Sequence, residues 1–227
     1  MKKLCSLLLA ILVCFSVSTA VFAEGSSTYS SVLNQEFSFS IGDDLTTIKV
    51  DLESMTANEI KSLSTYLQKN GTAELIAEIN ELADSIRSAE SKNSTLKNGQ
   101  TNKIVEVTPK ASSGRKTQLH SEEFYLGGLY YFYELTMGMD VTVSGNKITW
   151  AGNATIGNLR HGANPVALLG GNPTASVTSS GRDAIYQCTY QIQTIAARRL
   201  DNGNIVVPLD VTLSKSCSFI YSIEDNW

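Results

Sequence analysis

The chain has 227 residues, of which 42% are hydrophobic and 18% are charged, and its formal net charge is −4. Nucleic acids and anionic membranes are bound through clusters of lysine and arginine, so this mildly acidic composition argues against both partners. The length allows a substantial hydrophobic core, in one domain or in one domain with an appendage.

Residues 1–23 have the pattern of a cleavable secretory signal peptide. A short cationic start is followed by an apolar run over 4–17, and Ala23 is a small residue directly before the polar Glu24. The apolar run is too short to span a membrane, which takes about 20 residues. We therefore expect export to the extracellular space with cleavage between Ala23 and Glu24, and cleavage after Ala20 is the alternative.

The exported product is expected to carry no anchor. Bulky residues precede Cys14, which is unlike a lipoprotein signal, and no later segment is apolar enough for a transmembrane helix. Loss of Lys2 and Lys3 with the signal peptide leaves 16 basic residues against 22 acidic ones, a net charge of −6.

The segment 24–92 is expected to hold a β-hairpin and then a helical hairpin. Apolar residues alternate with polar ones over 37–41 and again over 45–52, on either side of a Gly-Asp-Asp turn. Thr56 and Glu59 form a capping-box pattern at the start of a first helix, which Asn70-Gly71 ends.

A second helix is expected from about residue 72. Its apolar positions fall on one stripe, formed by Leu75, Ile76, Ile79, Leu82, Ala83 and Ile86. We expect this stripe to pack on the rest of the fold, and a partner-binding helix is the alternative. Residues 93–123 are mostly polar and are predicted to be a linker, with a short strand possible over 103–108.

Residues 124–227 are predicted to form an antiparallel β domain, a sandwich or a barrel-like structure, which makes the whole chain α+β. Aromatic and β-branched residues dominate there, and turn signals at 144–147, 179–183 and 201–204 separate the expected strands.

Two cysteines remain in the exported chain, Cys188 and Cys217. Each lies in the apolar phase of an alternating strand pattern, so both side chains are expected to point into one core. In an extracellular protein, such a pair predicts a disulfide, which contributes roughly 3–4 kcal/mol in the chain-entropy model. Two buried free thiols are the alternative.

Catalytic signatures are absent from the sequence. His120, near the expected linker, and His161, in an expected loop, are the only histidines in the sequence and the candidates for a polar site. No G-x-S-x-G or H-E-x-x-H motif is present, and no cofactor or metal is predicted. Exposed aromatics could bind glycans, but we expect Trp150 and the tyrosines of the β domain to fill its core.

These patterns predict a secreted, non-enzymatic binding protein whose partner is an extracellular protein or a glycan. One alternative is a secreted hydrolase of wall or host polymers that uses His161 or paired acidic residues. Another is a precursor that releases its β domain as an effector, such as a toxin or a bacteriocin-like product.

Overall fold

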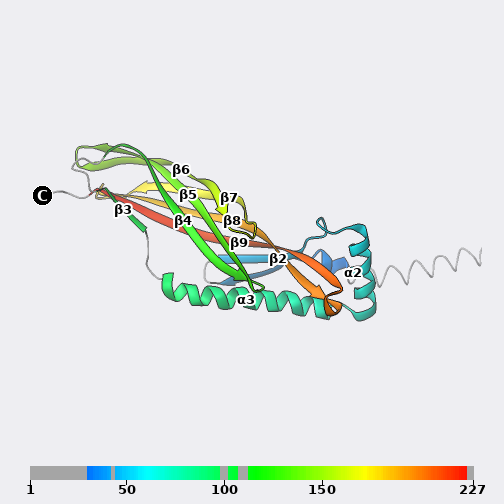
Figure 1. The fold of residues 1–227 in the computed structure, drawn as a ribbon. Helices are drawn as coiled ribbons and strands as arrows, with labels where there is room; N and C mark the ends of the chain where they lie inside the picture. The colour runs from blue at the N-terminus through cyan, green and yellow to red at the C-terminus, as the bar shows by residue number, and fades with distance from the viewer. Residues whose placement is uncertain (1–29, 42–43, 98–101, 107–111, 224–227) are drawn as a thin grey trace, which may run out of the picture. The chain divides into compact units, whose positions relative to one another are not determined.

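The computed structural model describes residues 30–41, 44–97, 102–106 and 112–223 (Figure 1). The predicted signal peptide and its cleavage site at Ala23 and Glu24 lie outside the described residues, as does part of the turn expected between the first two strands. No helix in the described parts of the chain has the length and apolar character needed to cross a membrane.

The chain divides into two compact units that interleave along the sequence. Among the described residues, the first unit contains 30–37, Lys49–Asn80 and Ala197–Leu209. The second contains Ser38–Ile48, Glu81–Ala196 and the chain from Asp210 onward. The sites described below each lie within one unit.

The expected β-hairpin and helix pair are present. Strands β1 (Phe37–Ile41) and β2 (Asp44–Val50) are neighbours in one sheet. Helix α2 (Ala57–Asn70) begins with the predicted capping box: Thr56 Oγ1 accepts a hydrogen bond from the Glu59 backbone, and the Glu59 carboxylate accepts one from the Thr56 backbone. These bonds satisfy donors that a helix start leaves unpaired.

Helix α3 (Ala73–Lys97) is longer than the short second helix that the sequence suggested. Five of the six stripe residues are buried, and Ile76 is half-buried. The apolar stripe is therefore a packing surface of the fold, as expected, along the part of α3 whose side chains are described.

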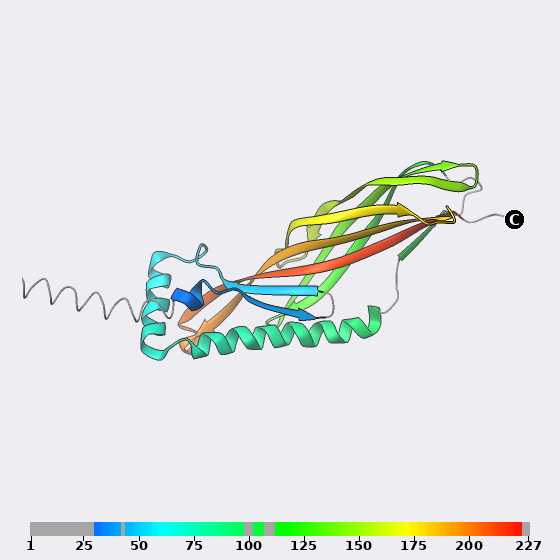
Figure 2. The ribbon, with the colours of Figure 1, turned by 180° about the vertical axis from the view of Figure 1, so that it is seen from behind.

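The larger sheet has the strand order β1-β2-β9-β8-β7, and β3 pairs with β9 in parallel. Its further strands are β3 (Asn102–Glu106), β7 (Ala167–Val177), β8 (Asp183–Leu200) and β9 (Ile205–Ile223). Figure 2 shows β7 in yellow beside β8. A short 3-10 turn, η1 (Asp201–Gly203), joins β8 to β9 where the Asp-Asn-Gly signal predicted a turn.

The smaller sheet is a meander of β4 (Gly114–Leu126), β5 (Leu129–Ser144) and β6 (Lys147–His161). Gly127 and Gly128 join β4 to β5 with φ angles of 58° and 80°, the positive values that a tight hairpin turn requires. Through its described strands, neither sheet closes on itself.

The stretch 93–123, expected as a polar linker, holds the end of α3, strand β3 and the first part of β4. The expectation of a linker rested on its polar composition. In β4, however, the inward positions themselves carry polar side chains, those of Lys116, Gln118, His120 and Glu122. An alternation of apolar and polar residues, the usual signal of a strand, is therefore missing there.

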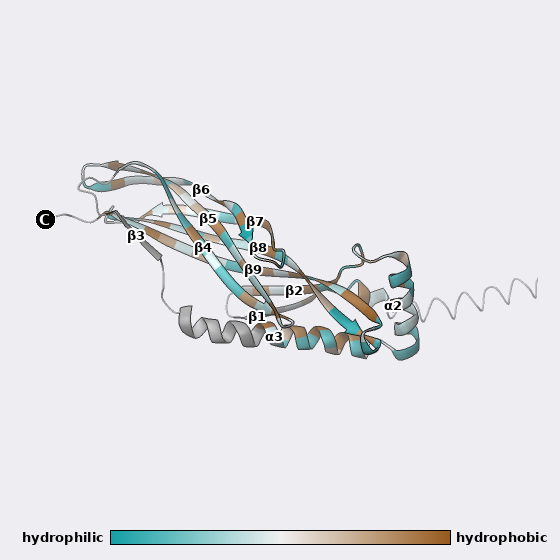
Figure 3. Ribbon diagram, viewed as in Figure 1, coloured by the Kyte–Doolittle hydropathy of each residue, from teal (hydrophilic) through white to brown (hydrophobic). Residues whose placement is uncertain are grey.

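The core follows the two-residue period of the strands. Along β8, the buried residues are Ala184, Tyr186, Cys188, Tyr190, Ile192, Thr194, Ala196 and Leu200. Figure 3 shows the resulting succession of hydrophobic and hydrophilic segments along the strands. In the second unit, side chains of each sheet donate to backbone carbonyls of the other: Tyr131 donates to the Ile195 carbonyl at 3.0 Å, and Tyr186 donates to the Thr155 carbonyl at 3.0 Å.

Candidate functional site

His120 belongs to a hydrogen-bonded cluster between the two sheets. Its Nε2 lies 2.9 Å from the Tyr190 hydroxyl and 3.4 Å from a carboxylate oxygen of Glu122. The hydroxyls of Tyr133 and Tyr190 are 2.8 Å apart, and Tyr133 also donates to Glu122 at 3.4 Å. The cluster links β4 and β5 of the smaller sheet to β8 of the larger one.

The environment of the two phenols keeps them protonated. Burial raises the pKa of Tyr133, and the negative charge of Glu122 raises it further. Burial likewise raises the pKa of Tyr190, with added contributions from Tyr133 and Glu122. Protonated phenols can donate and accept hydrogen bonds at once, so the cluster satisfies its own polar groups.

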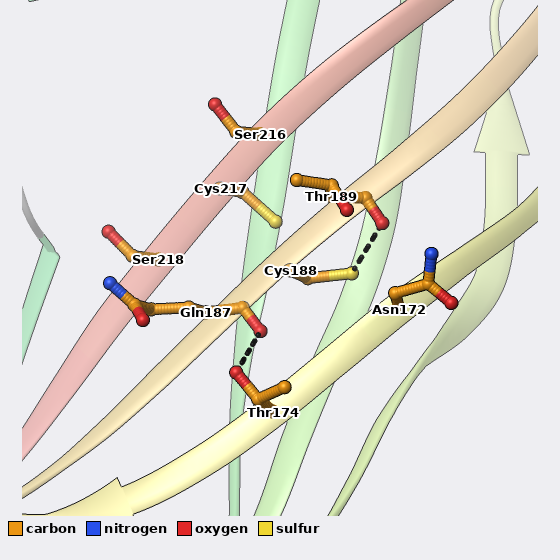
Figure 4. Close-up of a pocket in the computed structure, with 8 residues that line it drawn as sticks. All are labelled: Asn172, Thr174, Gln187, Cys188, Thr189, Ser216, Cys217 and Ser218. Carbon is orange, nitrogen blue, oxygen red and sulfur yellow. Dashed lines mark hydrogen bonds between the residues drawn. The ribbon is translucent and has the colours of Figure 1, made fainter.

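The two cysteines lie next to this cluster on neighbouring strands, Cys188 on β8 and Cys217 on β9 (Figure 4). Both are free thiols in this structure, and the Cys188 thiol donates a hydrogen bond to the Thr189 carbonyl at 3.3 Å. The neighbouring Cys217 thiol lowers the pKa of Cys188, and Cys188 together with burial raises the pKa of Cys217.

An open groove of ≈ 520 Å³ reaches both cysteines (Figure 4). Its lining comprises Asn172, Thr174, Gln187, Cys188, Thr189, Ser216, Cys217 and Ser218. None of these side chains is an acid or a base at neutral pH, apart from the thiol pair itself. The groove therefore suits a small uncharged molecule better than an ionic one.

His161 is placed away from this cluster. It ends β6, and its Nδ1 lies 2.9 Å from the carbonyl oxygen of Gly162. Among the described residues it forms no ion pair with a carboxylate. The structure thus brings His120 together with other polar groups but gives His161 no partner that would make it a general base.

The outer face of the smaller sheet carries exposed aromatic side chains at both ends, contrary to our expectation that these rings fill the core. Trp150 is 45% exposed, Tyr125 58% and Tyr130 44%, whereas Tyr131 and Tyr133 are buried as expected. A methyl group added at Gly152 would overlap the Trp150 indole, so that ring lies flat against the sheet. Its other side is left to solvent.

Hydrogen-bonding groups are fixed between the aromatic ends. Arg115 donates to Asp140 at 3.2 Å, to the Asn153 carbonyl at 2.7 Å and to Thr155. Hydrogen bonds from Asn153 and Arg115 lower the pKa of Asp140 and keep it ionised. At the other end, the Tyr130 hydroxyl donates to Glu123 at 2.7 Å.

A groove of ≈ 380 Å³ lies between these two ends. It is lined by Leu119, Glu134, Thr136, Asn158, Leu159 and Arg160. Register pairs place Leu119 opposite Thr136 and Arg160 opposite Glu134, on the same face as Trp150. We name this whole surface, from Trp150 to Tyr130, the aromatic-ended face.

The described residues contain no group of three or more His, Cys, Asp or Glu side chains arranged to hold a metal ion. The sequence predicted the positions of some site residues and missed those of others. The inward tyrosines and cysteines follow the strand period, but the outward position of Trp150 is visible only once its pairing with Thr142 is known. Glu122 carried no signal, because it stands in a stretch without apolar alternation.

Comparison with known proteins adds no relative: no protein-family model, no curated protein and no solved structure matches the chain.

Proposed function

We propose that the chain is an exported, non-enzymatic binding protein that holds a linear glycan on the aromatic-ended face. The observation that carries this proposal is the pair of exposed aromatic ends with fixed hydrogen-bonding groups between them. We propose further that the two sheets form an antiparallel sandwich, which leaves this outer face free of the core.

Sugars present apolar C–H faces and hydroxyl edges, and this surface offers partners for both. The flat indole of Trp150 and the rings of Tyr125 and Tyr130, 5.4 Å apart, supply stacking area. Asp140 and Glu123 supply carboxylate acceptors that neighbouring groups already hold in place. Side chains that are fixed beforehand lose little freedom on binding, which favours affinity.

The dimensions favour a polymer over a single sugar. Trp150 pairs with Thr142, twelve positions along β5 from Tyr130. At about 3.3 Å per strand residue, the two ends are roughly 40 Å apart. Acidic and basic groups alternate along the face, so a neutral or zwitterionic chain is a better match than a highly charged one.

The test is a titration of the purified protein with soluble cello- and chito-oligosaccharides and with peptidoglycan fragments, monitored by tryptophan fluorescence and calorimetry. We expect saturable binding to at least one of them. Trp150→Ala should weaken that binding about tenfold, equivalent to about 1.4 kcal/mol. A matched control is Ile195→Ala, since Ile195 is 49% exposed but lies on β8 of the other sheet.

Saturable binding that Trp150→Ala weakens about tenfold and Ile195→Ala leaves intact supports the proposal. If the two variants bound with equal affinity, the aromatic-ended face would not be the binding surface. The release of shorter products from any of these polymers would instead favour the hydrolase hypothesis. The intact mass of the protein from the culture medium tests export, and a fragment starting within 93–123 would favour the precursor hypothesis.

A further inference from the structure

We propose that Arg160 forms a subsite for a carboxylate of the bound glycan, at a bulge of β6 between the two ends of the aromatic-ended face. The inference rests on the proposed glycan binding and names the class of polymer. That class is a linear glycan in which a short apolar branch ends in a carboxylate, as it does in a lactyl ether. All residues of the subsite belong to the second compact unit.

Two of the bulges in β6 contain an asparagine in the left-handed region. At each of them β6 advances three residues while the paired β5 advances two, and φ is 46° at Asn153 and 50° at Asn158. A bulge redirects the side chains beside it, and non-glycine residues held in this conformation are often found at binding sites. The two bulges therefore mark two places along the face where polar groups are positioned.

The arginine at the first bulge already has its acceptors within the protein. Arg115 donates to three oxygen atoms there, those of the Asp140 carboxylate, the Asn153 carbonyl and the Thr155 hydroxyl. Asn153 also donates from its side chain to Asp140 at 2.9 Å. This bulge is therefore a closed polar cluster, which leaves its arginine few donors for a ligand.

The arginine at the second bulge has no such acceptors. Arg160 is exposed, and among the described residues it forms no hydrogen bond or ion pair, although it stands opposite Glu134 in register. Glu134 is half-buried and accepts a hydrogen bond from Ser121 at 3.4 Å instead. The planar guanidinium of Arg160 thus keeps its donors available for an anion from outside.

The groove beside Arg160 combines this charge with apolar surface. Its volume is ≈ 380 Å³, and its lining includes Leu119, which is 59% exposed, and Leu159. A guanidinium binds a carboxylate through two parallel hydrogen bonds, while the leucines offer contact area to a methyl group. A carboxylate on a short apolar branch uses both features. One such group per bound chain is enough, which agrees with the mixed charges along the rest of the face.

Glu134 makes the charge of the ligand testable. Among the described residues that line the groove, it is the only acid. Its negative charge opposes a bound carboxylate but would attract the ammonium group of an amino sugar. Arg160→Gln and Glu134→Gln should therefore change the affinity in opposite directions, and those directions identify the charge that is bound.

The test uses glycan strands of alternating N-acetylglucosamine and N-acetylmuramic acid, freed of their stem peptides so that the lactyl carboxylates are exposed. Carboxyl-reduced strands, in which each carboxylate has become an alcohol, are the matched ligand. In calorimetry, Arg160→Gln should bind the native strands about tenfold more weakly than the wild type does, and the reduced strands within about twofold. Glu134→Gln should bind the native strands more tightly.

Arg199→Gln is the matched control variant. It makes the same change at an exposed position of β8 in the other compact unit, so its affinities should equal those of the wild type. Added salt supplies a control that needs no variant. It should weaken wild-type binding of the native strands and have little effect on the reduced ones.

Equal losses of affinity for native and reduced strands in Arg160→Gln would overturn the carboxylate subsite. Tighter binding by Arg160→Gln with weaker binding by Glu134→Gln would also overturn it, since an amino sugar gives these signs. Hyaluronan oligosaccharides carry their carboxylates on the sugar ring, and an affinity equal to that of the native strands would refute the apolar branch. If Trp150→Ala weakens binding and Arg160→Gln does not, the subsite is wrong and the proposed function stands; if no glycan binds, both are wrong.

Discussion

The Tyr190 hydroxyl allows a quantitative test of the cluster between the sheets. Tyr190 is 2% exposed and lies within 2.9 Å of both His120 Nε2 and the Tyr133 hydroxyl. Tyr190→Phe keeps the ring and removes these bonds, which leaves the buried Tyr133 hydroxyl and the part-buried His120 ring each short of one partner. At neutral pH we expect the free energy of unfolding to fall by about 1–2 kcal/mol.

The same substitution should change how stability depends on pH. Burial raises the pKa of Tyr190 and of Tyr133 above the value of 10.0 expected for the unfolded chain. Above pH 10 the unfolded chain releases both phenol protons while the folded protein keeps them, so each tyrosine lowers stability as the pH rises. Each contributes a loss of about 1.4 kcal/mol per pH unit.

The free energies of unfolding of the wild type and of Tyr190→Phe should therefore become equal at alkaline pH. The wild type loses about 2.7 kcal/mol per unit through these two phenols, and the variant, with Tyr133 alone, loses about 1.4 kcal/mol. Their stability curves should meet about one unit above pH 10. Urea unfolding monitored by circular dichroism at a series of pH values measures both curves. Parallel curves would show that the Tyr190 proton is not held by the fold, and the reasoning would fail.

Three further outcomes are expected. Gly171→Ala places a Cβ 2.9 Å from the Ile156 Cγ2, so it should cost about 1–3 kcal/mol in urea unfolding, whereas Gly157→Ala, with nothing within 4 Å, should cost less than half as much. Thr56→Ala removes one half of the capping box and should lower thermal stability by about 1 kcal/mol; an unchanged melting temperature would contradict that role. Arg115→Lys cannot hold three acceptors in one plane, so glycan affinity should fall several-fold with little change in circular dichroism.

Local signals in the sequence were sufficient where one short pattern determines the structure. Thr56 and Glu59 define a helix start through bonds that span only three residues. The Tyr186 to Ile192 alternation identifies a strand and its buried face without knowledge of its neighbours. The same two-residue period predicted that each cysteine lies on the inward face of its strand.

Non-local pairing determined what the sequence could not predict. The parallel pairing of Asn102 with Phe219 joins distant segments, and no local pattern encodes it. Whether a ring is buried or exposed depends on which face of the smaller sheet meets the larger one, which decides between Tyr131 and Tyr130. The sequence did not predict strand β4, because its inward side chains are polar. They bond to tyrosine hydroxyls on β5 and β8 instead of packing against hydrocarbon.

Strand β9 has a consequence for how this chain can change over evolutionary time. From Val207 to Ile223, every second side chain of β9 points to the same face, and the strand pairs with β2, β3 and β8. Deleting a single residue within it would turn every later side chain to the opposite face and expose Phe219 and Tyr221 to water. Homologous chains should therefore differ in length at the tight turns, such as Gly127-Gly128 and Asp201–Gly203, while β9 accumulates substitutions only.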